Sequence, residues 1–334
     1  MILENVCRSV KQRAPSKLRL SSSAYLLAFL LLPCVILTLL TVPAFAIRLV
    51  NVKLLFEIKG EFNKPTDVAV SKNGLIYVVD GVNNQIKVFN SKGEFSKSFG
   101  KKGSGKGEFR SPLGIDIDDE GKVYVADSGN HRVQILDAKG NFIEKIRLPR
   151  QKDERPPDPT DVAVDDLHHK CYIVDNDNHR VLAYDLSRLQ LLRTYGSHGT
   201  GTDRFRYPFF IALGKEQTLY VVDVINTRVQ VLNSEGVFIA EIGGWGVEKG
   251  EFFRPKGVAI DKHNRVYVSD SYLGVIQVFA ATGEFYAALG DPATGKVKKF
   301  RTPMGLFVDQ QNRLYVVETL ANKVSVYQLQ GAAE

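Results

Sequence analysis

A repeat of 47 to 49 residues runs through most of this 334-residue chain and constrains its fold more than any other feature. One marker of the repeat is a proline that opens each copy, at Pro65, Pro112, Pro159, Pro208, Pro255 and Pro303. A second marker is an acid that ends a tyrosine-centred strand, at Asp80, Asp127, Asp175, Asp223, Asp270 and Glu318. The two markers agree on six copies, and a fixed period of this length indicates a repeat architecture.

Each copy contains a set of short strands. In the second copy, residues 111–137 read SPLGIDIDDEGKVYVADSGNHRVQILD, in which Gly, Asn and Asp turns separate three runs of β-branched and aromatic residues. An outer run follows in five copies, as FSKSFG, FIEKIRL, LLRTYG, FIAEIGG and FYAALG. Four strands per copy predict an all-β fold, a six-bladed β-propeller of four-stranded antiparallel blades over residues 50–330.

The two ends of the repeat region complement each other. The sixth copy ends at VSVYQLQGAAE and has no outer strand of its own. Leu54–Gly60, LLFEIKG, precedes the first proline and has the outer-strand pattern. We therefore predict that this segment completes the sixth blade and closes the ring.

The copies resemble NHL repeats. From Gly107 the second copy reads GEFRSPLGIDID and then VYVADSGNHRVQILD, and the third contains DVAVDD followed by CYIVDNDNHRVLAYD. Both follow the order of a Gly-rich loop, Phe-x-x-Pro, a strand, and Tyr-Val-x-Asp-x-x-Asn-x-Arg. The resemblance extends over about residues 50–330 and implies a six-bladed propeller. It implies no single activity, because NHL-like propellers include binding scaffolds, receptor ectodomains, RNA binders and a few lyases.

Some copies depart from this pattern. The Asn position of the turn becomes Leu273 and Ala321 in the last two copies, and the Arg position becomes Val275 and Lys323 there. We expect the Asp, Asn and Arg of the turn to bond the backbone and one another, which is a structural role. We therefore expect blades five and six to have lost this network, either through drift or because their surface is free to contact a partner.

Residues 1–46 have the features of a membrane-targeting segment. Residues 1–23 form a flank with five basic residues and one acid, which should remain in the cytoplasm. Residues 24–46, AYLLAFLLLPCVILTLLTVPAFA, carry no charge and predict one N-terminal transmembrane or signal helix. Two outcomes stay open: a retained signal anchor, which we favour, and a signal peptide cleaved after Ala46. In both cases the repeat region is expected outside the cytoplasm.

Cysteine and histidine usage gives no cofactor or metal signature. Cys171 is the only cysteine in the repeat region, and the sister copies have aliphatic residues at its position, so we predict a buried thiol. The six histidines have no metal-ligand spacing, and no nucleophile–base pair stands out. We therefore expect no cofactor and no metal centre, and we favour a protein that is not an enzyme.

The main candidate site is basic. The loops before the first strand of each copy are rich in Lys and Arg, and such loops share one face of a propeller. Arg110, Arg206 and Arg301 each stand two residues before a repeat proline, and Trp245 is an aromatic candidate for contact. The predicted binding residues are Lys101, Lys102, Arg110, Arg204, Arg206, Trp245, Arg254, Lys299 and Arg301.

A second candidate is acidic. Asp67 and Asp161 stand two residues after Pro65 and Pro159, whereas four sister copies have Gly or Phe there. If the first strands line the central channel, these carboxylates lie near its mouth and form a candidate cation site. The alternative is that they cap turns.

Two classes of function remain open. The first is an extracytoplasmic, membrane-tethered propeller that binds a protein or an anionic envelope polymer through its basic loop face. Nucleic acid is disfavoured as a partner because the leader directs the domain out of the cytoplasm. The alternative is an extracytoplasmic enzyme of lyase or lactonase type that uses the channel mouth. A cluster of polar residues with perturbed pKa values around the channel mouth would favour the enzyme. A channel filled with apolar side chains would favour the binding protein.

Overall fold

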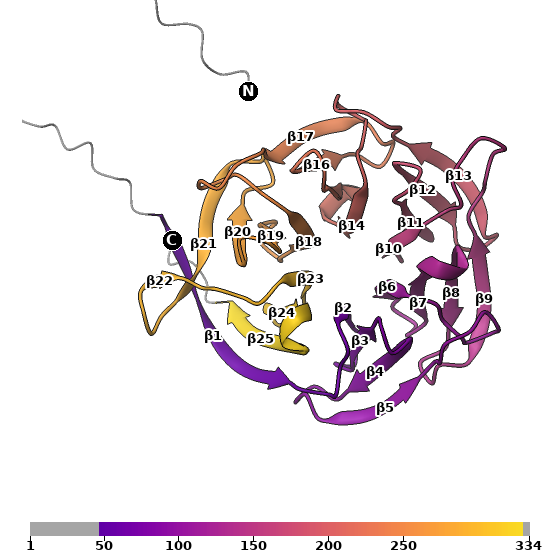
Figure 1. The fold of residues 1–334 in the computed structure, drawn as a ribbon, viewed down its shortest axis with the longest axis horizontal. Helices are drawn as coiled ribbons and strands as arrows, with labels where there is room; N and C mark the ends of the chain where they lie inside the picture. The colour runs from indigo at the N-terminus through magenta and orange to yellow at the C-terminus, as the bar shows by residue number, and fades with distance from the viewer. Residues whose placement is uncertain (1–46, 330–334) are drawn as a thin grey trace, which may run out of the picture. The chain divides into compact units, whose positions relative to one another are not determined.

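The computed structural model describes residues 47–329, which form a ring of six blades around a central channel (Figure 1). The basic flank at 1–23 and the transmembrane or signal helix expected at 24–46 lie outside the described residues. Within the described residues, no helix combines the length and the apolar character that a membrane crossing requires.

Each blade is an antiparallel meander whose strands follow one another from the channel outward. Blades one to three comprise β2 (Pro65–Val70), β3 (Ile76–Asp80), β4 (Gln85–Phe89) and β5 (Phe95–Phe99); β6 (Pro112–Ile117), β7 (Val123–Asp127), β8 (Arg132–Leu136) and β9 (Phe142–Arg147); and β10 (Pro159–Asp165), β11 (Lys170–Asp175), β12 (Arg180–Asp185) and β13 (Gln190–Tyr195). Blades four to six comprise β14 (Pro208–Leu213), β15 (Leu219–Asp223), β16 (Arg228–Leu232) and β17 (Phe238–Gly243); β18 (Pro255–Ile260), β19 (Val266–Asp270), β20 (Val275–Phe279) and β21 (Phe285–Asp291); and β23 (Pro303–Val308), β24 (Arg313–Glu318), β25 (Lys323–Leu329) and β1 (Leu49–Ile58). The strand β22 (Lys296–Val297) and the short 3-10 turns η1 (Ser128–Asn130), η2 (Lys215–Gln217) and η3 (Thr319–Ala321) complete the elements. The predicted all-β propeller of four-stranded antiparallel blades is confirmed.

The hydrophobic core lies between the blades. The second strand of every blade is buried on both faces, which explains why it reads as a run of Val, Ile and Tyr instead of an alternating pattern. Its central tyrosine is at most 3% exposed in all six blades. Six apolar clusters result, each shared by two neighbouring blades, so every blade depends on both neighbours for its core.

The N-terminal strand closes the ring, as predicted. β1 pairs antiparallel with β25, from Val52 opposite Leu329 to Ile58 opposite Val324, with a bulge between Leu54 and Phe56. The strand begins five residues earlier than the sequence pattern indicates. Its first residues also pair in parallel with β21 of the fifth blade, from Leu49 opposite Ala288, so the fifth and sixth blades form one continuous sheet.

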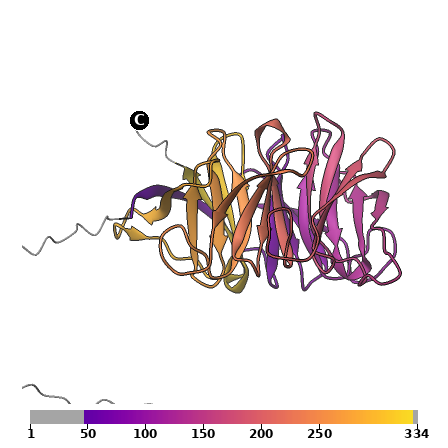
Figure 2. The same cartoon turned by 90° about the horizontal axis from the view of Figure 1, so that it is seen from above.

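The meander gives the ring two faces, which the side view separates (Figure 2). Loops from an outermost strand to the next innermost strand lie on the same face as the turns between second and third strands. Hydrogen bonds join the two sets: Gly129 N–H donates to the Arg110 carbonyl at 2.8 Å, and Ile225 N–H donates to the Arg206 carbonyl at 3.2 Å. We call this side the basic face, made of residues 59–64, 100–111, 148–158, 196–207, 244–254 and 292–302 with the turns 81–84, 128–131, 176–179, 224–227, 271–274 and 319–322.

Candidate functional site

The acid that ends each second strand fixes the loop above it. The Asp127 carboxylate is fully buried and accepts a hydrogen bond from the Arg110 N–H at 2.7 Å. Asp223 does the same for Arg206 at 2.7 Å, and Glu318 for Arg301 at 2.9 Å. The repeated acid therefore holds the backbone of the loop, while the Arg side chains remain available at the surface.

A cation completes this arrangement in most blades. The Arg132 guanidinium donates to Asp127 at 2.8 Å and to the carbonyls of Gly105 and Glu108. Arg180 and Arg228 bind their own buried acids at 2.9 and 3.0 Å. This confirms the structural role expected for the Asp, Asn and Arg of the turn.

The blades that lack this arginine retain the arrangement in other ways. In the first blade, Lys87 lies 3.0 Å from Asp80 although the Arg position holds Gln85. In the sixth, Lys323 lies 3.2 Å from Glu318. The fifth blade has Val275 at the Arg position, and the backbone N–H groups of Phe253, Arg254, Tyr272 and Leu273 donate hydrogen bonds to its acid, Asp270. The expectation that blade six has lost the network is therefore wrong.

All nine predicted binding residues lie in loops of the basic face, on four blades. Most are exposed, and Arg206 is half-buried. Lys101 forms an ion pair with Glu108 at 3.4 Å, and Lys299 donates to the Leu273 carbonyl at 3.0 Å. Among residues 47–329, the guanidinium groups of five predicted residues form no ion pair, namely those of Arg110, Arg204, Arg206, Arg254 and Arg301.

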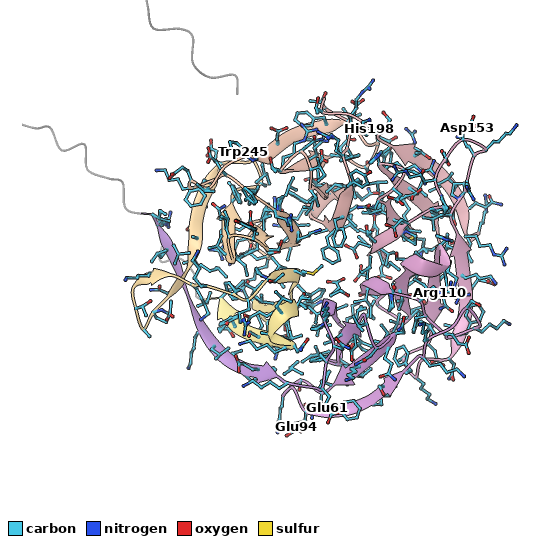
Figure 3. All side chains as sticks on the ribbon, in the orientation of Figure 1. Glu61, Glu94, Arg110, Asp153, His198 and Trp245 are labelled. Carbon is cyan, nitrogen blue, oxygen red and sulfur yellow. The ribbon has the colours of Figure 1, made fainter. Side chains whose placement is uncertain are left out.

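Three loops of the basic face share one construction. Residues 102 and 109, 198 and 205, and 245 and 252 form equivalent parallel bridges, which bury Phe109, Phe205 and Phe252. Lys102, His198 and Trp245 therefore occupy equivalent positions in the loops that lead into three different blades. Figure 3 labels His198 and Trp245, together with Arg110, on the ring. Trp245 is 76% exposed, so a large aromatic side chain is presented to solvent beside the cations.

The two faces differ in charge. The segments of the basic face hold 17 Lys and Arg residues and nine Asp and Glu residues. The turns of the opposite face hold eight Lys and Arg residues and eleven Asp and Glu residues, over 71–75, 90–94, 118–122, 137–141, 166–169, 186–189, 214–218, 233–237, 261–265, 280–284 and 309–312. The described domain therefore has a polarised field, positive on one side.

The channel contains a cavity of about 240 Å³. Its walls are chemically divided. Asp67, Asp116 and Asp161 come from blades one to three, whereas Phe210, Ile211, Leu306 and Phe307 belong to the apolar wall of blades four and six.

The carboxyls of the channel bond the innermost strands of neighbouring blades. Ile115 N–H donates to Asp67 Oδ2 at 2.9 Å, and Ile211 N–H donates to Asp161 Oδ2 at 2.9 Å. Val164 N–H donates to Asp116 at 2.7 Å. An innermost strand is a sheet edge with unpaired N–H groups, and these carboxyls satisfy three of them.

Burial dominates the ionisation of the same carboxyls. It raises the pKa of Asp67 to about 8 and that of Asp116 to about 7. Burial, and then the neighbouring charge of Asp67, raise the pKa of Asp161 well above its usual range. The direction follows because no cation compensates the lost hydration of these groups.

The candidate cation site at Asp67 and Asp161 stays a prediction. The structure brings both carboxyls to one cavity, but each has an oxygen engaged with a neighbouring blade. Residues 47–329 hold no group of three or more His, Cys, Asp or Glu side chains placed to bind a metal ion. Backbone bonding accounts for the two aspartates without a cation.

Lys256 lies near the channel on the basic-face side. Its ammonium is 3.8 Å from the centre of the Phe209 ring, and burial lowers the pKa of Lys256 to about 8, with Arg254 contributing in the same direction. Lys256 is the second residue of β18, and the repeat pattern gave no indication of its burial.

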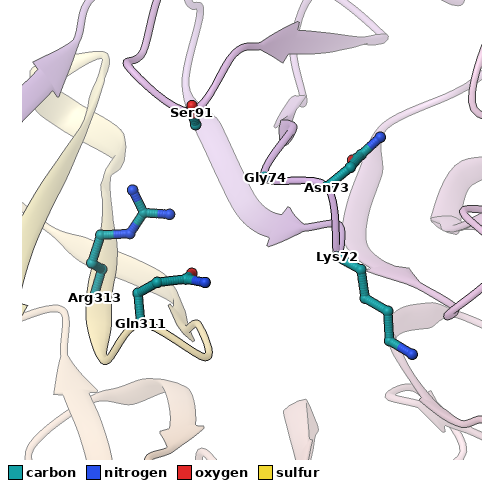
Figure 4. A pocket seen from close by; sticks show the side chains of 6 residues that line it. All are labelled: Lys72, Asn73, Gly74, Ser91, Gln311 and Arg313. Carbon is teal, nitrogen blue, oxygen red and sulfur yellow. The ribbon is translucent and has the colours of Figure 1, made fainter.

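A second concavity lies on the opposite face, between the first and sixth blades. This groove of about 390 Å³ is lined by Lys72, Asn73, Gly74, Ser91, Gln311 and Arg313 (Figure 4). Lys72 is paired with Asp119 at 2.5 Å and Arg313 with Asp309 at 2.6 Å. Both cations of the groove are therefore already neutralised by a carboxylate, and neither is available as an unpaired charge for an anionic ligand.

The sequence interpretation missed two sets of residues. Asp116 lines the cavity, but its position in the repeat gave no signal that it faces the channel. Exposed apolar side chains also stand on the basic face, at the second residue after the repeated acid, namely Val82, Ile225, Tyr272 and Leu320. The repeat alignment contained this signal, because a turn position should be polar and these four are not.

Fold and site together define a six-bladed β-propeller with a basic loop face and a partly acidic channel. A family model described as a six-bladed β-propeller matches residues 59–155, which is less than a third of the chain. No curated protein matches the sequence.

Solved structures share the fold at low sequence identity. A streptogramin B lyase is 14% identical with a TM-score of 0.59, over 82% of this chain and 97% of that chain. A gluconolactonase from Xanthomonas campestris is 16% identical with a TM-score of 0.64, over 86% and 93%. A protein of unknown function from Bacteroides thetaiotaomicron is 15% identical with a TM-score of 0.60, over 85% and 73%. At these identities the likeness shows the fold alone.

Proposed function

We propose that this chain is an extracytoplasmic, membrane-tethered propeller that binds an anionic partner, a protein or an envelope polymer, through its basic face. The observation that carries the proposal is the charge difference between the two faces, 17 basic and nine acidic residues against eight and eleven. The absence of ion pairs at Arg110, Arg206, Arg254 and Arg301, within residues 47–329, supports it further. Paired surface cations would already be neutralised by their own chain.

The test is capture of partners from envelope extracts with the full chain in detergent. We expect the variant Arg110→Glu/Arg206→Glu/Arg301→Glu to lose partners that the wild-type chain retains. The matched control is Lys92→Glu/Lys139→Glu/Arg188→Glu, which makes the same change of charge on exposed residues of the opposite face. Partners should also dissociate as salt rises, because exposed charges are screened. Identical partners for all three proteins at low salt would contradict the proposal.

The tether is part of the same proposal and has its own test. Residues 24–46 are uncharged and 23 residues long, which supports a membrane span. Alkaline extraction of membranes should leave the full chain in the pellet, and N-terminal sequencing should recover the residues before Ala46. A soluble product that starts at Ile47 would instead identify a cleaved signal peptide.

We also propose that the blades are NHL-type repeats. The support is the buried Asp with its Asn and Arg partners, which recurs in blades two, three and four. The residue pattern and this hydrogen-bonded turn coincide at the same positions. Replacing Asn130 by Leu, the residue of the fifth blade, should destabilise the turn; an unchanged melting temperature would argue against a shared motif.

A second candidate function is an enzyme of lyase or lactonase type that uses the channel. The observation that favours it is the set of three buried carboxyls with raised pKa values in one cavity. The apolar residues that line the rest of this cavity, among them Phe210 and Leu306, favour a binding protein instead. Lactone hydrolysis and lyase assays with the wild-type chain and with Asp67→Asn/Asp116→Asn/Asp161→Asn test this function. A wild-type activity that survives in the triple variant does not come from the channel carboxyls.

A further inference from the structure

Four exposed apolar side chains of the basic face occupy one equivalent position in the repeat; the others are Trp245, Val247 and Phe253, in the loop before β18. Val82 is 52% exposed, Ile225 49%, Tyr272 65% and Leu320 56%, and each is the second residue after the repeated acid. The corresponding residues of blades two and three are Gly129 and Asp177. The apolar positions therefore belong to blades four, five, six and one, which follow one another around the ring (Figure 1).

The turn that carries each of these side chains is hydrogen-bonded, backbone to backbone, to a loop residue that is a cation or directly adjoins one. Ile225 N–H donates to the Arg206 carbonyl at 3.2 Å. Ser271 N–H, next to Tyr272, donates to the Arg254 carbonyl at 3.0 Å.

The same pairing recurs in the other two blades. Thr319 N–H, next to Leu320, donates to the carbonyl of Thr302, the neighbour of Arg301. In blade one, Val82 N–H donates to the carbonyl of Asn63, the neighbour of Lys64. We call these four pairs the docking arc, defined as Arg206 with Ile225, Arg254 with Tyr272, Arg301 with Leu320, and Lys64 with Val82.

The docking arc is held rigidly. In each loop a buried acid accepts a hydrogen bond from the backbone N–H of the cation itself or, in blade one, from that of Asn63, which precedes Lys64. The side chains therefore project from a backbone with little freedom. In the fifth blade, the rings of Phe253 and Tyr272 lie 4.3 Å apart at 32°, which gives a flat aromatic platform beside Arg254. A preformed surface loses less entropy on binding than a flexible one.

The charge of the docking arc and the exposure of its apolar side chains indicate which class of partner can bind there. Its four cations form no ion pair within residues 47–329, so a complementary partner supplies carboxylates or other anions. Val82, Ile225 and Leu320 are 49% to 56% exposed, so about half of each side chain remains available to pack against the side chains of a partner. Half-covered apolar side chains flanked by cations suit incoming side chains of another polypeptide.

We propose that the docking arc binds an extended polypeptide segment that carries carboxylates next to bulky apolar side chains. The inference rests on the proposed anionic partner of the basic face and specifies its chemistry. The cations bind the carboxylates of the segment, and the turn residues of successive blades contact its apolar side chains. Specificity then comes from the apolar contacts, because charge alone attracts any polyanion.

The test uses two labelled peptides of equal charge, four repeats of Glu-Leu-Gly and four repeats of Glu-Ser-Gly, with the full chain in detergent. Fluorescence anisotropy measures both affinities at the same salt. We expect the leucine peptide to bind at least tenfold more tightly, since even two partly buried leucine side chains account for such a ratio. In Ile225→Ser/Leu320→Ser, the ratio should fall below about threefold while the serine peptide binds as before.

Two further variants complete the design. Val237→Ser/Ile239→Ser removes equally exposed apolar side chains outside the basic face and should leave the ratio unchanged. Tyr272→Ser is a second arc variant, which should lower the ratio on its own if the double variant does not fold.

The outcomes separate this inference from the proposed function. Equal affinity of the two peptides for the wild-type chain, with both lost in Arg110→Glu/Arg206→Glu/Arg301→Glu, overturns the docking arc and leaves the anionic partner intact. Failure of both peptides to bind overturns an acidic polypeptide partner and the arc with it. Peptide affinity that falls when neutral lipid nanodiscs are replaced by anionic ones identifies a bilayer as the occupant and also overturns the arc.

Discussion

Replacing the two core-facing residues of the closing strand, in Val52→Ala/Ile58→Ala, is expected to destabilise the whole ring. Val52 is 2% exposed and Ile58 is 1% exposed. Val52 packs in the cluster between blades five and six, and Ile58 in the cluster between blades six and one. The two substitutions therefore weaken both interfaces of the sixth blade through one strand.

The size of the effect follows from burial. Truncation of a buried isoleucine to alanine costs about 2–5 kcal/mol, and a valine, one methylene smaller, costs somewhat less. The two positions lie about 20 Å apart along the strand, so the losses should add to about 4–7 kcal/mol. For a domain of this size each kcal/mol lowers the melting temperature by about 2–4 °C, which predicts a fall of about 10–20 °C.

Calorimetry of the full chain in detergent is the assay. The matched control is Leu54→Ala/Leu55→Ala on the same strand, where the side chains are 47% and 40% exposed. The control should lower the melting temperature by less than about 4 °C. Equal, small shifts for both variants would refute the view that β1 holds the ring closed.

Three further predictions concern the channel and the loops. Asp67→Asn should remove a pH dependence: the folded state keeps a proton on Asp67 up to about pH 8, the unfolded chain loses it near pH 4, and wild-type stability therefore falls as pH rises through this window. A melting temperature that changes equally between pH 5 and pH 8 in both proteins would contradict this. Gly305→Ala should lower stability by about 1–3 kcal/mol in urea unfolding, because its Cβ would stand 2.2 Å from Asp67 Oδ1; Gly244→Ala, which meets nothing within 4 Å, should not. Arg132→Met should destabilise by about 3–5 kcal/mol and expose residues 101–109 to trypsin, since Asp127 and two loop carbonyls lose their partner; a loop that stays resistant would show that the arginine is dispensable.

The six-bladed fold could be predicted from the sequence because every copy of the repeat specifies one blade. Each proline at the start of an innermost strand and each acid at the end of a second strand occupies the same structural position in all six blades. Closure by residues near Leu54 followed from counting outer strands, and β1 confirms it. Such features depend on local pattern and on copy number, which a sequence displays directly.

The site was less accessible because it depends on relations between blades. A single repeat shows no reason why Asp116 should meet an N–H group of the third blade. Lys87 replaces the missing arginine of blade one from within β4, two residues after the Arg position. The parallel pairing of Leu49 with Ala288 had no signal either, because the pattern of an outer strand does not specify a second partner. Asp116 and Val164 lie 48 residues apart, which matches the repeat period, but the sister copies have Ala or Phe at the position of Asp116, so the repeat pattern does not reveal this contact.

The N-terminal origin of the closing strand has a consequence for how the chain folds. The paired residues of β1 and β25 are between 266 and 277 positions apart, so the strand that is synthesised first finds its antiparallel partner last. Until then Val52 and Ile58 have no core to enter, and the edge of the strand can pair with other chains. Non-local closure of this kind slows folding. Of the described strands, β1 is therefore the one that stays without its antiparallel partner for longest during synthesis, and its unpaired edge is where association with other chains is expected to begin.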